Sequence, residues 1–252
     1  MSKWTTVLGV MAVFGFPALS CAETVTVAVA SNFLGPLKQI ARQFEAETGH
    51  AARIVSGSTG KLYAQIKNGA PFHVFLAADS KRPRLLEEEQ LASPGWRFTY
   101  ARGKLVLWSA DPESINEDGA GVLKTGKFRH LAVANPKTAP YGRATQSTLQ
   151  KLGLWEALQQ RIVRGENVVQ TFQFAASGNA EFGFVALSQV LALPPGKQGS
   201  RWDVPQSFHP PIDQDAVLLA KGIHNAAAKA LLEFLKSPAT KRQIGAFGYD
   251  TD

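Results

Sequence analysis

The octapeptide Val55-Ser56-Gly57-Ser58-Thr59-Gly60-Lys61-Leu62 lies between two segments of different apolar spacing. The apolar run Ala51 to Val55 before it favours a strand, and Leu62 to Ile66 after it has the spacing of a helix. The small polar residues therefore fall at the start of a helix, where free N–H groups and the positive end of the helix dipole point outward. A turn of this kind, carrying several hydroxyls, is suited to bind a small anion.

Three other interpretations of this octapeptide have to be weighed. Gly60-Lys61 is similar to the end of a P-loop, but Leu62 stands where that motif needs Ser or Thr. Ser58 is a candidate hydrolase nucleophile, but Ser56 replaces the first glycine of the G-x-S-x-G motif. The third interpretation is a plain helix N-cap by Ser58 or Thr59 with nothing bound, and it stays open because Ser and Thr are common caps.

The first 22 of the 252 residues have the features of a secretory signal peptide. Lys3 provides a positive start, Val7 to Phe16 is apolar but too short to span a bilayer, and Ser20-Cys21-Ala22 is a small-residue cleavage site. We therefore expect an exported, periplasmic protein whose mature chain lacks cysteine. The cysteine of this site also admits a lipoprotein, but Ala18-Leu19-Ser20 before it is a poor lipobox.

The composition predicts a folded globular protein, because 45% of the residues are hydrophobic and 19% are charged. The net charge is +7, but Lys and Arg are scattered rather than clustered, so we expect no nucleic-acid partner. The excess positive charge favours the approach of anions. The chain is expected to act as a monomer.

Strands and helices alternate along the chain, which predicts an α/β fold with two similar halves, residues 25–103 and 104–212. The expected strands are Thr24–Ala30, Ala51–Val55, Val74–Ala77, Lys104–Trp108, His130–Ala134, Arg161–Arg164, Phe182–Ala186 and Ala216–Ala220. The expected helices are Phe33–Glu47, one from Leu62 to about Asn68, Arg143–Leu152, Val168–Ala176, Asn225–Leu235 and Ser237–Phe247.

Four polar turns follow strands of this predicted fold. Ser31-Asn32 and the octapeptide belong to the first half, and Pro140-Tyr141-Gly142 and Asn167-Val168 belong to the second. Ligands of open α/β sheets bind beyond the carboxyl ends of the strands, so these turns are the candidate binding site.

The sequence offers little for catalysis or for metal binding. The five His residues lie far apart and none falls in a polar turn, so Ser31 or Ser58 would lack a base as the nucleophile of a secreted hydrolase. Tyr63 and Tyr141 are a possible tyrosine pair for ferric iron, but these turns lack the acidic or His partners that a cation needs. We expect no enzyme activity and no cofactor.

Five segments of the mature sequence follow one another in a characteristic order and spacing: Ala28–Phe33, Ser56–Ile66, Asn68–Asp79, Ala139–Gly142 and Gly165–Val168. In these segments, and along nearly its whole length, the mature sequence resembles the periplasmic molybdate-binding proteins of ABC importers. It implies a two-lobed periplasmic-binding-protein fold of the type II kind. In that fold each lobe is a mixed sheet flanked by helices, and an oxyanion lies in the cleft between the lobes.

The resemblance also implies which residues hold the ion. These are Ser31 and Asn32, Thr59 with Ser58 beside it, the hydroxyl of Tyr141, and the N–H of Val168. Some relatives provide a tyrosine where this chain has Ala186, which makes Tyr141 the expected substitute. The implied ligand is molybdate or tungstate, delivered to a membrane permease. Another oxyanion such as sulfate stays an alternative ligand.

Two further expectations concern the lobes and the charges beside the site. The C-terminal strand and helices lack a sheet of their own, so we expect a first lobe of residues 23–102 and 215–252 and a second lobe of residues 103–214. Lys61 and Arg143 flank site turns, but we expect their side chains to point to solvent rather than to the anion.

Overall fold

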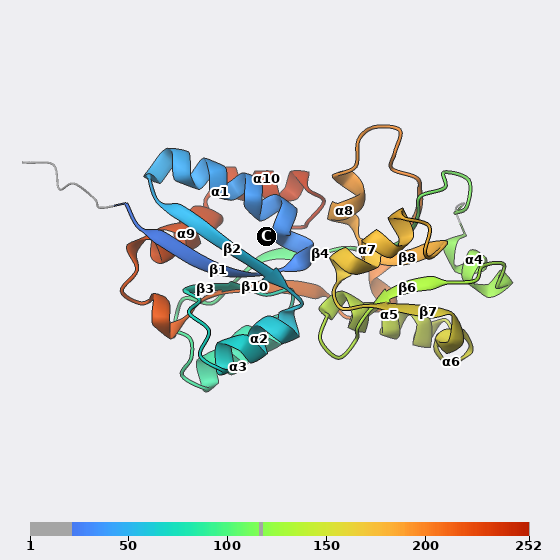
Figure 1. Ribbon diagram of the computed structural model, residues 1–252, viewed down its shortest axis with the longest axis horizontal. Helices are drawn as coiled ribbons and strands as arrows, with labels where there is room; N and C mark the ends of the chain where they lie inside the picture. Colours follow the sequence, from blue (N-terminus) through green and yellow to red (C-terminus); the bar gives the residue numbers. More distant parts are fainter. Residues whose placement is uncertain (1–21, 116–117, 252) are drawn as a thin grey trace, which may run out of the picture.

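The computed structural model describes residues 22–115 and 118–251, so all of the predicted signal peptide except Ala22 lies outside the described residues. The chain forms two α/β lobes that lie side by side (Figure 1). Each lobe contains one five-stranded mixed sheet flanked by helices, as the sequence predicts. No helix of the described residues is both long enough and apolar enough to cross a membrane.

The sheet of the first lobe has the strand order β2-β1-β3-β10-β4. β1 is parallel to β2 and β3, whereas β10 is antiparallel to β3 and β4. β1 occupies the centre of the parallel part, and its Val-rich run is buried on both faces, as expected for a strand covered by helices on both sides. The strands are β1 (Thr24–Ala30), β2 (Ala51–Gly57), β3 (Val74–Leu76), β4 (Phe98–Gly103) and β10 (Ile212–Leu218).

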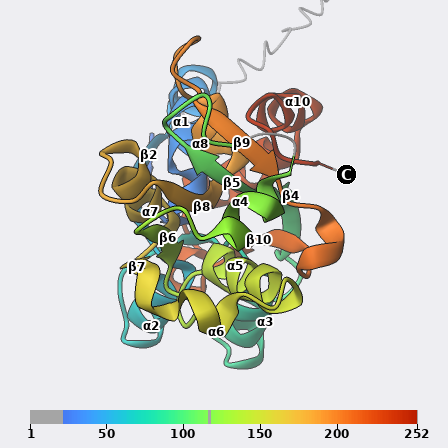
Figure 2. The same ribbon diagram turned by 90° about the vertical axis from the view of Figure 1, so that its right-hand side faces the viewer.

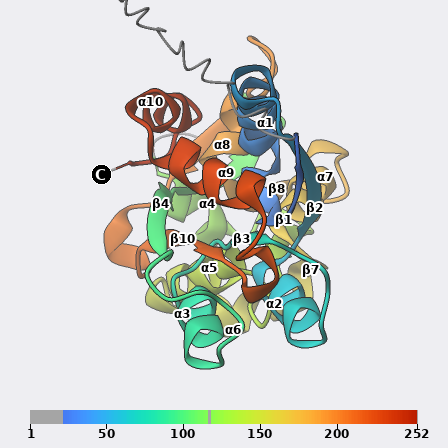
Figure 3. The same cartoon turned by 90° about the vertical axis from the view of Figure 1, so that its left-hand side faces the viewer.

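Helices cover both faces of this first sheet. One face packs against α1, α9 and α10, and the other packs against α2 and α3 (Figure 3). Alternate side chains of β1 separate the two apolar layers, with Val27 in one and Ala28 in the other. The helices are α1 (Leu34–Thr48), α2 (Thr59–Lys67), α3 (Lys81–Glu88), α9 (Ala226–Lys236) and α10 (Pro238–Ala246), and the 3-10 helices are η1 (Ser31–Phe33) and η4 (Ala220–Gly222).

The second sheet repeats this plan with the strand order β7-β6-β8-β5-β9. β6 is parallel to β7 and β8, and β5 is antiparallel to β8 and β9. α7 packs on one face of this sheet and α5 on the other (Figure 2). The strands are β5 (Leu105–Ser109), β6 (Leu131–Ala134), β7 (Ile162–Gly165), β8 (Phe182–Ala186) and β9 (Ser200–Asp203). The helices are α4 (Gly119–Thr125), α5 (Pro140–Lys151), α6 (Trp155–Leu158), α7 (Val168–Ala176) and α8 (Leu187–Leu191), with η2 (Gln159–Arg161) and η3 (Gln206–Phe208).

Two connections join the lobes. β4 of the first sheet passes into β5 of the second through the single residue Lys104, and the chain returns from β9 to β10 through a Pro-rich segment that contains η3. β10 lies in the first sheet, between β3 and β4. The exact division of the chain between the lobes, at residues 102/103 and 214/215, stays a prediction.

Several predicted elements differ from those in the structure. α5 begins at Pro140 rather than Arg143, because a proline at the first helical position has a suitable φ and needs no N–H partner. β10 covers Ile212–Leu218 rather than Ala216–Ala220, and its polar residues Gln214 and Asp215 are buried and hydrogen-bonded. The short helices α3, α4, α6 and α8 and the strands β4 and β9 were missed, since each carries too few periodic apolar residues.

Candidate functional site

A small cavity lies between the two lobes, where the strand ends β1, β2 and β3 of the first lobe face the helix starts α5 and α7 of the second. The residues that line it are Ala30, Ser31, Asn32, Gly57, Ser58, Thr59, Ala78, Ala139, Pro140, Tyr141 and Val168. All six residues predicted for the site are among them, and all of these lining residues are uncharged.

The cavity is small and has room for a compact group of a few atoms. The space open to the centre of a water-sized sphere is about 10 Å³. A sphere of this volume has a radius of about 1.3 Å, and adding the ~1.4 Å radius of a water molecule gives an object of about 2.7 Å radius. An ion of a few atoms has this size, whereas an organic solute of ordinary size does not.

The first polar turn joins β1 to α1 through η1. Ser31 and Asn32 are buried, with 7% and 4% of their surface exposed. The Asn32 side-chain Nδ2 donates hydrogen bonds to Gln214 Oε1 (2.9 Å) and to the hydroxyl of Tyr249 (3.2 Å). The side-chain amide of Asn32 is therefore hydrogen-bonded to other residues of the protein. Its main chain, at the start of η1 where N–H groups lack intrahelical partners, is what remains to contact a ligand.

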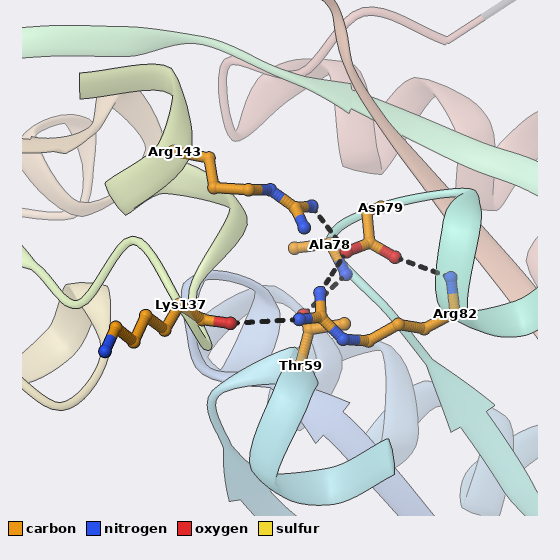
Figure 4. Close-up of polar contacts among 6 residues, drawn as sticks. All are labelled: Thr59, Ala78, Asp79, Arg82, Lys137 and Arg143. Atoms are coloured by element: carbon orange, nitrogen blue, oxygen red, sulfur yellow. Dashed lines mark hydrogen bonds and ion pairs between the residues drawn. The ribbon is translucent and has the colours of Figure 1, made fainter. Parts of the chain in front are cut away.

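The second polar turn, the octapeptide, does not behave as a plain N-cap. Ser58 occupies the N-cap position of α2 with extended backbone, but its side chain makes no capping hydrogen bond. Ser58 Oγ is buried and has no hydrogen-bond partner among the described residues. Thr59 Oγ1 accepts a hydrogen bond from the Ala78 N–H (3.0 Å) across the strand ends, which leaves its own proton free to be donated (Figure 4). Both hydroxyls are thus placed for a ligand.

The second lobe provides a phenol and a helix start. Tyr141 lies in the first turn of α5 with 2% of its surface exposed, and its hydroxyl accepts a hydrogen bond from Gln214 Nε2 (3.5 Å). Burial raises the pKa of Tyr141 well above its ordinary value, with a further contribution from the nearby Tyr249, so the phenol keeps its proton. Asn167 Oδ1 caps α7 by accepting hydrogen bonds from the N–H groups of Val169 and Gln170. The Val168 N–H is not bonded to this oxygen.

The main chains of the two lobes meet beside the cavity. The Gly60 N–H of α2 donates to the Thr138 carbonyl oxygen of the second lobe (2.8 Å). A Cβ atom at Gly60 would lie 3.0 Å from the Thr138 main chain, so this close approach favours glycine. The lobes are therefore in direct contact around the site.

Charged side chains surround the cavity, but they pair with one another between the lobes. Lys61 of α2 forms an ion pair with Glu166 of the second lobe. Asp79 accepts from Arg82 of its own lobe and from Arg143 Nη2 of the second lobe (2.8 Å), as Figure 4 shows. Lys61 and Arg143 do not line the cavity, and their side chains are 54% and 40% exposed, which agrees with the prediction that they point away from the anion. The prediction did not include the carboxylate that each one pairs with across the interface, which a sequence alone does not place.

A buried polar network beside the site was also missed by the sequence analysis. It consists of hydrogen-bonded side chains, of which Ser188–Tyr249 and Tyr141–Gln214 are joined across the lobes; its members are Asn32, Tyr100, Tyr141, Ser188, Gln214 and Tyr249. Burial raises the pKa of Tyr249 to about 12, so it too stays protonated. The one signal in the sequence is the polar Gln214 inside a run that was expected to be loop. The described residues contain no group of three or more His, Cys, Asp or Glu arranged to hold a metal ion.

Comparisons with known proteins agree with this geometry. The bacterial extracellular solute-binding protein family matches residues 25–250. The molybdate-binding protein ModA of Azotobacter vinelandii is 53% identical over 93% of this chain and 94% of its own length, and that of Rhodobacter capsulatus is 50% identical over 95% and 93%. The solved periplasmic molybdate-binding protein of Azotobacter vinelandii superposes with a TM-score of 0.87 at 45% identity, covering 90% of this chain and 99% of that one.

Proposed function

Because the chain belongs to the bacterial extracellular solute-binding proteins, and within them to the molybdate-binding proteins, we propose that it binds molybdate and delivers it to an ABC transporter. We place the ion in the cavity between the lobes. Its contacts there are the hydroxyls of Ser58, Thr59 and Tyr141, together with Ser31, the main chain of Asn32, and the N–H of Val168.

The observation that carries this assignment is the hydroxyl of Ser58. A buried hydroxyl without a partner costs free energy, and the great majority of such groups in proteins are paired. Ser58 Oγ lies at the start of α2, next to the Thr59 hydroxyl, and both line the cavity. An oxyanion in the cavity would accept its proton, and hydrogen bonds to charged acceptors are the strong ones. The starts of α2, α5 and α7 add positive potential.

The absence of charge from the cavity lining favours an anion that carries no proton. Molybdate and tungstate are dianions of nearly equal size at neutral pH, and we propose that the site accepts both. A protonated anion such as hydrogen phosphate needs an acceptor for its proton. The carboxylate of Asp79, next to the lining residue Ala78, lies outside this cavity and accepts from two arginines. Sulfate is smaller and is expected to bind more weakly, since it cannot reach all donors at once.

The location and partners follow from the same family membership. The solved relative is periplasmic, and we propose that the present chain is exported through its first 22 residues and works as a monomer that meets a membrane permease. The relatives are named as binding proteins rather than enzymes. We propose accordingly that the Ser58 hydroxyl binds the ligand without forming a covalent bond to it.

An oxyanion panel tests this function. Molybdate, tungstate, sulfate and phosphate are each titrated into the mature protein by calorimetry, and the melting temperature is measured with each. We expect tight binding and a large melting shift with molybdate and tungstate, and weak or no binding with sulfate and phosphate. Tighter binding of sulfate than of molybdate would refute the proposed ligand. Ferric iron binding, or activity in an esterase screen, would favour the alternatives.

A further inference from the structure

The two chain segments that connect the lobes pass directly beneath the hydroxyl of Tyr141. Gln214 lies in β10, is completely buried, and sits at a register irregularity where β10 pairs with β4. Gly103 is the last residue of β4 and pairs with Ile212 of β10. Tyr141 itself belongs to α5 of the second lobe, so its contact with Gln214 crosses between lobes.

The orientation of the Gln214 amide is determined by its other partners. Its Oε1 accepts from Asn32 Nδ2 (2.9 Å) and lies 3.0 Å from the Tyr100 hydroxyl, whose single proton it shares with the Ala77 carbonyl oxygen (3.0 Å). An amide oxygen only accepts and an amide nitrogen only donates, so the Nε2 side must be the one that faces Tyr141. The phenol oxygen of Tyr141 is then an acceptor in this contact, at 3.5 Å, and its single proton is left to be donated elsewhere.

Gly103 makes room for this arrangement. A Cβ atom at this position would lie 2.2 Å from the Tyr141 hydroxyl oxygen and 2.6 Å from Gln214 Nε2. Real Cβ atoms do not approach other atoms so closely, so any side chain here would displace both groups. Gly103 and Gln214 together therefore form a seat for the end of the Tyr141 ring, which we call the hinge seat.

The Thr59 hydroxyl of the first lobe is oriented in the same way as the Tyr141 hydroxyl of the second lobe. Thr59 Oγ1 accepts the Ala78 N–H at 3.0 Å, as the Tyr141 oxygen accepts the Gln214 N–H. Each hydroxyl therefore presents its proton, rather than only its lone pairs, to the cavity between them. A ligand that offers acceptors only is favoured by both lobes at once.

We propose that Gln214, supported by Gly103, is a positioning residue that makes the Tyr141 hydroxyl a hydrogen-bond donor to the bound oxyanion. This inference rests on the proposed function and adds to it two residues that do not line the cavity. It also couples the site to the hinge, because the donor of the second lobe is oriented by a strand of the first.

A double-mutant cycle tests this proposal by calorimetry with molybdate. Gln214→Met removes the amide, and it is made both in the wild-type chain and in Tyr141→Phe. If Gln214 acts through the phenol, Gln214→Met should weaken binding about 5- to 30-fold in the wild type and clearly less in Tyr141→Phe, where only the loss of the partner of Asn32 Nδ2 remains. An equal loss in both backgrounds, or no loss in either, would overturn the proposal.

Gly103→Ala gives a second and independent test, in case Gln214→Met folds poorly. The added methyl group meets the Tyr141 oxygen, so its cost in molybdate affinity should be several-fold in the wild type and clearly smaller in Tyr141→Phe, where that oxygen is absent. An equal cost in both would contradict the role of the hinge seat. Apo melting temperatures show whether each variant is folded.

Tyr63→Phe is the matched control. Tyr63 lies on the surface of α2, outside the cavity, and its phenol hydroxyl donates to Glu89 at the end of α3, so its removal should leave molybdate affinity within about twofold of the wild type. A wild-type protein that does not bind molybdate would count against the proposed function. A wild type that binds, with Gln214 variants showing no coupling to Tyr141, would count against this inference alone.

Discussion

The interior of the cleft and its rim are built from opposite kinds of residue. The cavity is lined by hydroxyls, small apolar side chains and helix starts without charge, whereas charged side chains stand just outside it. Lys61 pairs with Glu166, and Arg143 pairs with Asp79, each across the two lobes. This difference supports our proposal that neutral donors select the anion, and it places the charged side chains in ion pairs between the lobes.

The free-energy cost of burying an unpaired charge explains why the charged side chains lie outside the cavity. A lysine or arginine in the cavity would attract any anion, protonated or not, and would have to be buried unpaired whenever the site is empty. Neutral hydroxyls and N–H groups avoid this cost and bind a charged acceptor strongly. At the rim, Lys61 and Glu166 remain about half exposed, so their pairing costs little desolvation.

The largest loss of molybdate affinity is expected when a negative charge is placed inside the uncharged cavity. Ser58→Asp places a carboxylate beside the proposed position of the dianion. Two unit charges about 4 Å apart repel by roughly 4 kcal/mol at an effective dielectric constant of 20, and the double charge of the ion doubles this repulsion, so molybdate affinity should fall by far more than about a thousandfold. Calorimetry measures the loss. Retained binding would mean that the ion lies elsewhere.

A smaller effect is expected when one neutral donor is removed without adding charge. Thr59→Val should weaken molybdate binding about 10- to 150-fold, because a hydrogen bond to a charged group contributes roughly 1.5–3 kcal/mol. The Ala78 N–H also loses its buried acceptor, so apo stability should fall by about 1–3 kcal/mol. Thr59→Ser keeps the hydroxyl and is the control. Equal affinity of the Val and Ser variants would exclude the Thr59 hydroxyl from the site.

At the rim, the Arg143 pair is expected to act on closure rather than on anion recognition. Arg143→Met keeps the aliphatic stem but removes the bond to Asp79, which Arg82 continues to pair. We expect a loss of about 2- to 10-fold in molybdate affinity and a weaker salt dependence, since partly exposed ion pairs are screened by salt. Titrations at low and high salt measure both. A loss of a hundredfold or more would place Arg143 on the anion itself.

The smallest effect is expected at Lys61. Its pair with Glu166 is about half exposed on both sides, and such pairs contribute roughly 0.2–1 kcal/mol. Lys61→Ala should therefore change molybdate affinity by less than about fivefold, and Glu166→Ala by a similar amount. A much larger loss in Lys61→Ala than in Glu166→Ala would show that the lysine contacts the ligand directly.

The sequence predicted those helices and strands whose bounds are determined by neighbouring residues, such as helix caps and continuous apolar runs. α7 and β8 have the predicted bounds, because Asn167 caps the helix and β8 is a continuous apolar run. Gly49 ends α1 in the left-handed conformation, as a glycine after a helix commonly does. The turns after β1 and β2 were found because ligand sites of α/β sheets lie at the carboxyl ends of strands.

The features that were missed depend on contacts between distant parts of the chain. Gln214 and Gly103 lie in crossing strands, and what they do follows only from the position of Tyr141 above them. Likewise, the partners of Lys61 and Arg143 come from the opposite lobe. No spacing within the sequence states which residues face one another across a cleft. The six predicted site residues line one cavity, and their roles in binding stay a proposal.

Ser58→Ala tests whether the uncharged cavity between the lobes binds the anion. Ser58 Oγ has no hydrogen-bond partner among the described residues, so its removal takes no hydrogen bond from the apo protein and the apo melting temperature should stay within a few degrees. Molybdate affinity measured by calorimetry should nevertheless fall about 10- to 150-fold. Wild-type affinity in Ser58→Ala would contradict the account, because the buried hydroxyl would then not face the ion.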